Sequence, residues 1–184
     1  AYGNFVYRSL SFIEKKGGVI PKPDTYNDED RAFENKLESL WAVEKKLEHM
    51  ELKESLEEIF HTINDANRYF NSRAPWKIED PEELATVLYL SAKAAYSFAL
   101  ALSPFLPFSS DRVFRSFGVN SPEKWADVSA FKPGLKIGGA KPLFVKLEDD
   151  KIAEEIAKMA PKEPSATSSS GKGKTPKPAS NKKG

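Results

Sequence analysis

A helix-like spacing of apolar residues that stops at a proline is the feature of this sequence that most constrains its fold. Between residues 56 and 70, side chains that suit one buried helical face recur every three or four positions: Leu56, Ile59, Phe60, Ile63, Asn67 and Phe70. Pro75 has no backbone N–H and disfavours the helical region for Ala74, so the helix is predicted to end near Arg73. A long helix with an abrupt end is therefore expected here.

Trp76 follows directly after this stop, and two interpretations are open for it. An indole that projects from the helix tip beside Asn71 and Arg73 makes a stacking platform with polar neighbours, which is how single-stranded bases are held. An indole that closes the bottom of a hydrophobic core is the structural alternative. The local pattern fits both.

The rest of the chain shows further helical periods, separated by Gly and Pro. We expect an all-α protein: an antiparallel bundle of about five helices, then a short extended piece, a last helix and a disordered tail. The expected helices cover about residues 2–16, 30–50, 53–73, 81–102 and a short segment ending at Gly118, and the extended piece at 143–147 precedes a helix over about 151–159. The alanine-rich segment 81–102 is predicted to be the central helix.

Certain residues are expected to begin or anchor these elements. The predicted N-caps are Asn27 or Asp28 for the second helix, Ser109 or Ser110 for the fifth and Asp149 or Asp150 for the last. Trp41 lies in register with an apolar stripe and is predicted to belong to the core. Residues 120–142 read as a loop, which Trp125 is predicted to anchor to the bundle.

Composition limits the kinds of site that the chain can hold. The 184 residues include no cysteine, and the two histidines fall on separate predicted helices, so we expect no disulfide and no metal site. No apolar run approaches the length of a membrane span, and the first residues do not resemble a signal peptide. A soluble, cytoplasmic protein with no membrane partner is therefore expected.

The charge is unevenly distributed. The net charge is +1, but residues 161–184 hold six lysines and one glutamate, so this tail is +5 and the remaining body is −4. We expect one bundle domain at 1–160 and a disordered tail or linker rich in Lys, Ser, Gly and Pro at 161–184. Because the body is mildly acidic, any polyanion must be met at a local site.

Two polar residues near the start share one helical face. Asn4 and Arg8 are four residues apart, so they point the same way, one turn apart along the axis. An Asn amide can bind a base edge, and an Arg guanidinium can hold a phosphate or a base. A solvated helix face is the alternative reading of this pair. We find no catalytic constellation in the chain.

Four segments together resemble one family. The segments are GNFVYRSLSFI (3–13), DANRYFNSRAPWKI (65–78), ALSPFLPFSSDRVF (101–114) and KPLFVKLEDD (141–150). In their order and spacing they resemble the C-terminal anticodon-binding domain of methionyl-tRNA synthetase, a class I aminoacyl-tRNA synthetase. The resemblance implies that Asn4, Arg8 and Trp76 contact the CAU anticodon of methionine tRNA. Asn71 and Arg73 are supporting candidates.

The resemblance also implies a division of labour. The family's catalytic domain, with its HIGH-like and KMSKS-like signatures and its use of ATP and Mg, has no counterpart in these 184 residues, so we expect the fragment to be inactive alone and to hold no cofactor. Its implied partners are the anticodon stem-loop of methionine tRNA and the catalytic domain of the same methionine–tRNA ligase.

A helical protein-interaction or dimerisation module without an RNA role is the rival hypothesis. It predicts that Asn4, Arg8 and Trp76 are scattered or buried. The anticodon-binding hypothesis predicts that they share one exposed end of the bundle.

Overall fold

Helices form where the apolar periods predict them, and the all-α class is confirmed. The computed structural model describes residues 1–122, 131–144 and 148–159. Its elements are α1 (Tyr2–Lys15), α2 (Asp28–Ser39), the 3₁₀ turn η1 (Leu40–Ala42), α3 (Val43–Glu48), α4 (Leu52–Arg73), α5 (Pro81–Leu102), α6 (Pro107–Ser116) and α7 (Asp149–Met159). The first six helices belong to a body at Ala1–Val145, and α7 belongs to a second unit, Lys146–Gly184. The sequence-based division had placed α7 with the bundle.

Local sequence explains where α2, α5 and α6 begin. Asn27 caps α2 through a capping box, in which its side chain accepts from the Asp30 N–H and the Asp30 carboxylate accepts from the Asn27 N–H. Asp80 caps α5, whose first residue is Pro81. The prediction that Ser109 or Ser110 caps the fifth helix was wrong, because α6 already begins at Pro107 and both serines are buried within it. Proline's fixed φ suits the first helical position, and it lacks only an N–H that would be unpaired there.

The second expected helix, 30–50, is interrupted in the structure. The turn η1 separates α2 from α3, and the buried residues at this break are Leu37, Leu40 and Val43. Side chains three residues apart stay on one face of a 3₁₀ turn, because that turn has three residues per turn. On an α-helix, which has 3.6 residues per turn, side chains at this spacing move gradually around the axis. A spacing of three is therefore compatible with the tighter turn. Trp41 is partly buried and packs against the core.

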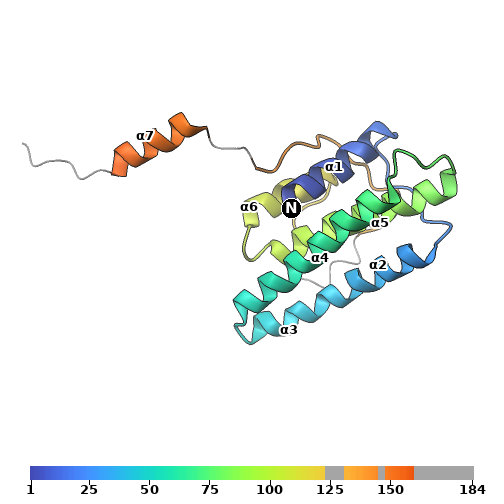
Figure 1. Ribbon diagram of the computed structural model, residues 1–184, viewed down its shortest axis with the longest axis horizontal. Helices are drawn as coiled ribbons and strands as arrows, with labels where there is room; N and C mark the ends of the chain where they lie inside the picture. Colours follow the sequence, from blue (N-terminus) through green and yellow to red (C-terminus); the bar gives the residue numbers. More distant parts are fainter. Residues whose placement is uncertain (123–130, 145–147, 160–184) are drawn as a thin grey trace, which may run out of the picture. The chain divides into compact units, whose positions relative to one another are not determined.

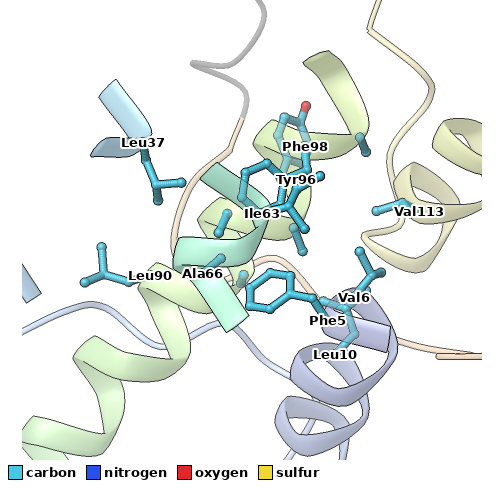
Figure 2. Close-up of a cluster of buried hydrophobic side chains, with 14 of the residues drawn as sticks. Phe5, Val6, Leu10, Leu37, Ile63, Ala66, Leu90, Tyr96, Phe98 and Val113 are labelled. Carbon is cyan, nitrogen blue, oxygen red and sulfur yellow. The ribbon is translucent and has the colours of Figure 1, made fainter. Parts of the chain in front are cut away.

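Helix α5 is the centre of the body, as its small residues predict. It contacts α1, α2, α4 and α6 (Figure 1). Phe98 of α5 lies in the core among side chains from these neighbours, including Phe5 of α1 and Ile63 of α4 (Figure 2). By length and composition α5 is apolar enough to cross a membrane, but 78% of its most apolar window is buried in the protein. Its apolar surface is therefore used for packing.

Residues 136–144 form a strap, an extended segment that links α1 to α6. The Ile137 N–H donates to the Gly18 carbonyl at 2.7 Å, and the Gly138 N–H donates to the Ser116 carbonyl at 3.0 Å. At the other end, Arg112 donates to the Leu143 carbonyl at 2.6 Å. The strap thus runs from the C-terminal ends of α1 and α6 back towards the first turn of α1 and the middle of α6. Within 120–122 and 131–142 the structure places neither helix nor strand, in agreement with the predicted loop apart from one isolated bridge, Val19 to Lys136.

Some expectations fall outside the described residues. Trp125 is one of them, and so are positions 145–147 of the expected extended piece and the tail from residue 160 onward. In the second unit, α7 begins at Asp149, so both aspartates predicted as caps lie in its first turn. Its apolar residues Ile152, Ile156 and Met159 are exposed.

Candidate nucleic-acid interface

The end of α4 presents Trp76 to solvent. Ala74, the C-cap residue, adopts a left-handed conformation with φ of 42°, and Pro75 after it is buried. This turn anchors the backbone while it directs the next side chain outward, and Trp76 is 52% exposed. The indole meets Phe70 edge-on, with ring centroids 6.0 Å apart at 60°. One side of Trp76 therefore rests on the bundle, and the rest is open for stacking.

Arg8 lies against the same ring, Phe70. Its Cζ is 5.2 Å from the centroid of the Phe70 ring, and its Nη2 donates to the Asn71 Oδ1 at 2.8 Å. Phe70 itself is only 2% exposed. A buried phenyl ring on α4 thus contacts both the α1 guanidinium and the Trp76 indole. Asn71, one of the supporting candidates, holds the arginine in place.

Asn4 extends this surface along α1. Its side chain is exposed, one helical turn before Arg8. It lines a hollow of about 370 Å³ together with Ala1, Gly3, Tyr7, Pro142, Leu143 and Phe144. Asn4 therefore borders the set formed by Arg8, Phe70 and Trp76 through its own helix. The rival hypothesis predicts that Asn4, Arg8 and Trp76 are scattered or buried. In the structure, Arg8 and Trp76 instead both contact the Phe70 ring.

The structure gives Arg73 a different environment. Its Nε donates to Asp30 Oδ1 at 3.0 Å and its Nη2 to Glu83 Oε1 at 2.7 Å, and its side chain is only 10% exposed. Asp30 is fully buried, and Tyr69 also donates to it at 2.7 Å. Arg73 therefore joins the start of α2, the end of α4 and the start of α5, and its predicted support of the RNA surface would act through this network.

The electrostatics of this network follow from burial and pairing. Burial, reinforced by the hydrogen bond to Asp30, raises the pKa of Tyr69 far above its usual value, so the phenol stays a neutral donor. For Arg73, burial favours loss of charge, but the bonds to Glu83 and the nearby Asp30 outweigh it and raise the pKa of the guanidinium. The network thus stabilises the helix end from which Trp76 emerges.

Two aromatic residues in this surface were not singled out as functional from the sequence. Phe70 was read only as a member of the apolar stripe, and its spacing of six residues from Trp76 across a proline gives no direct signal of contact. Phe144 lies in the KPLF segment and is 51% exposed. A Cβ at Gly3 would lie 2.6 Å from this ring, so a larger residue there would force the ring to shift. Within 1–122, 131–144 and 148–159, no cluster of three or more acidic or His side chains could hold a metal ion.

Comparison with known proteins identifies the family. Residues 20–163 match the sequence profile of the family described as the anticodon binding domain of methionyl tRNA ligase. The chain belongs to this family. The matched range of this methionyl-tRNA ligase domain includes Phe70, Asn71 and Trp76 and begins after α1, so it does not include Asn4 and Arg8.

Named relatives and solved structures agree with this family. The chain is 34% identical over 176 residues to the methionine–tRNA ligase of Methanosphaera stadtmanae, covering 85% of this chain and 26% of the relative. It is 36% identical to that of Bacillus cereus strain 03BB102, covering 86% and 29%. The crystal structure of free Mycobacterium tuberculosis methionyl-tRNA synthetase superposes with a TM-score of 0.72 at 26% identity, covering 80% of this chain and 32% of that one. The chain thus spans about a quarter of the length of its curated relatives.

Proposed function

We propose that this domain recognises the CAU anticodon of methionine tRNA, as the anticodon-binding part of a methionine–tRNA ligase. The observation that carries the proposal is the shared contact of Arg8 and Trp76 with Phe70, next to Asn4, on an exposed surface of a domain of this family. The catalytic part, joined to it in a longer protein, attaches methionine to the tRNA with ATP and Mg in the cytoplasm.

Each residue has a separate task in this proposal. An unstacked anticodon base lies against the open face of Trp76, whose other side Phe70 supports. Arg8 and Asn4 bind base edges or the adjoining phosphate. Because Asn71 already holds the Arg8 guanidinium at 2.8 Å, little side-chain freedom is lost when the RNA binds.

Specificity follows from unpaired groups. A wrong base leaves a donor or acceptor of Asn4 or Arg8 without its partner, which costs about 1 to 3 kcal/mol per base. This penalty corresponds to roughly a 5- to 150-fold loss of affinity. A few side chains are therefore enough to select one triplet.

ATP and Mg act, in this proposal, only on the catalytic part. Among residues 1–122, 131–144 and 148–159, no group of three or more His, Asp or Glu side chains could hold a metal ion. What the domain supplies is the positioning of the tRNA.

The test is a titration with anticodon stem-loops that carry CAU or a changed triplet. Trp76→Ala should weaken binding of the CAU stem-loop by about 5- to 150-fold, because one stacked base contributes roughly 1 to 3 kcal/mol. Phe60→Ala is the matched control, since Phe60 is a 38% exposed aromatic on α4, the helix that ends just before Trp76. Its affinity should equal that of the unmodified domain.

The unmodified domain must also distinguish the two stem-loops. Equal affinity for CAU and the changed triplet would contradict anticodon recognition. A protein that ignores both RNAs but self-associates in sedimentation would instead support the interaction-module hypothesis.

A further inference from the structure

A second hollow lies on the other side of the strap from the Asn4 hollow. Pro142 and Leu143 line both of them. The second hollow measures about 270 Å³, and its remaining lining residues are Arg112, Arg115, Ser116, Gly138, Gly139 and Lys141. The two hollows therefore share two consecutive strap residues as a common wall.

Three cations and no acidic residue line this second hollow. Lys141 is exposed, and the described part of the chain offers it no hydrogen-bond or ion-pair partner. Arg115 is 76% exposed and pairs on one side with Asp111 at 2.7 Å. Arg112 donates to the Leu143 carbonyl and so fixes the wall of the hollow. Since residues 1–160 carry a net charge of −4, this cationic group stands out against an acidic body.

The chemistry of the hollow suits a phosphodiester. A guanidinium and an ammonium can donate charge-assisted hydrogen bonds to the non-bridging oxygens of one phosphate. The Ser116 hydroxyl at its edge already donates to the Arg112 carbonyl at 3.1 Å. Contacts of this kind position a nucleic acid and carry no sequence information.

The hollow is also continuous with the surface that would bind bases. Phe144 and Asn4 line the neighbouring hollow, and Arg8 and Trp76 follow along α1 and Phe70. We propose that Arg115 and Lys141, on a frame fixed by Arg112, bind a backbone phosphate of the same RNA outside the three anticodon bases. This inference rests on the proposed anticodon recognition, and it lengthens the RNA segment that the domain holds.

The test compares two double variants at several salt concentrations. Arg115→Gln with Lys141→Gln removes two charges from the hollow and leaves Arg112 and the strap intact. Lys45→Gln with Lys53→Gln is the matched control, because it removes the same charge near the start of α4, at the opposite end of that helix from Trp76. The hollow variant should bind the CAU stem-loop about three- to tenfold more weakly at 0.1 M salt. Its slope of log affinity against log salt should be smaller by about 1.

The ratio of affinities for CAU and the changed triplet should stay unchanged in the hollow variant, because a phosphate contact is indifferent to sequence. Stem-loops with single uncharged methylphosphonates locate the contact. One substitution outside the triplet should weaken binding to the unmodified domain and have no effect on the hollow variant.

The inference is overturned if the hollow variant matches the control variant in affinity and slope. That result leaves anticodon recognition standing when the unmodified domain still prefers CAU. Loss of the CAU preference in the unmodified domain is the separate outcome that removes the proposed function. Thermal unfolding of both variants should match the unmodified protein, because the substituted side chains are exposed.

Discussion

The buried ion pair between Arg73 and Asp30 gives the sharpest test of how the RNA surface is supported. Replacing Arg73 by Met keeps most of the apolar stem and removes the guanidinium. Asp30 then loses a 3.0 Å bond from the Arg73 Nε and keeps Tyr69 and the Asn27 N–H as donors. A fully buried carboxylate is left without its cation.

The magnitude follows from this burial. Removing one partner of a buried pair costs about 3 to 5 kcal/mol, because the remaining charge stays desolvated and uncompensated. The bond to Glu83 adds little to this sum, because the Glu83 side chain is 37% exposed and water replaces the lost donor. For a domain of this size, a loss of about 3 to 5 kcal/mol lowers the melting temperature by roughly 6 to 20 °C.

The assay is urea unfolding followed by far-ultraviolet circular dichroism, with Arg68→Met as control. Arg68 is on the same helix and also pairs with an aspartate, Asp65, but its side chain is 78% exposed. Its substitution should cost no more than about 1 kcal/mol. The contrast between two Arg→Met changes on one helix isolates the effect of burial.

Stability and RNA binding together decide what Arg73 does. A change of less than about 1 kcal/mol in Arg73→Met would refute the claim that the buried pair matters. If that stable variant also lost affinity for the CAU stem-loop, Arg73 would return to the RNA surface as a direct contact. We expect unfolding to be easier and binding by the folded fraction to be nearly unchanged.

Two further predictions concern the same helix. Ala74→Gly should stabilise the domain by about 1 kcal/mol or less. Glycine relieves roughly 1 to 2 kcal/mol of left-handed strain at φ of 42°, but it also stabilises the unfolded state through added chain entropy of about 0.4 to 1 kcal/mol. A variant that is destabilised in urea unfolding would argue against strain at this position. At Asp65, burial favours protonation, but hydrogen bonds from Lys36 and Arg68 prevail and lower the pKa. The stability that the ionised Asp65 contributes is therefore fully present above its unfolded value of about 3.9 and is lost as the pH falls through the lower folded value. The unfolding free energies of the unmodified protein and of Asp65→Asn should converge only at such acidic pH, and a gap that stays constant down to pH 2 would contradict the assignment.

The sequence allowed the helix ends to be predicted where one residue decides the outcome. Pro75 ends α4 at Arg73, and Asn27 begins α2, because each acts on its own backbone or on its nearest N–H groups. The exposed position of Trp76 followed from the first of these. The break at η1 was missed because a stripe of apolar residues spaced by three also fits a single long helix.

Arg73 was grouped with Asn71 because the two are close along the chain, although the structure places them in different environments. Asn71 and Arg73 are two residues apart, which places them about 200° apart around a helix, so they cannot both face Arg8. The partner of Arg73, Asp30, is 43 positions away and was read only as part of a helix start. Phe70 posed the same problem, since its contacts with Arg8 and Trp76 exist only once α1 has packed against α4.

The strap brings the last residues of the body back to its first helix. The ring centroid of Phe144 is 6.3 Å from that of Tyr2, so these two residues, near the two ends of the described body, meet at one corner. Polypeptide attached before and after the bundle must leave from that corner, so the bundle can be inserted into a larger chain without forcing its flanks apart. The same closure makes a circular permutant, joined at this corner and opened at the turn around Met50, topologically feasible.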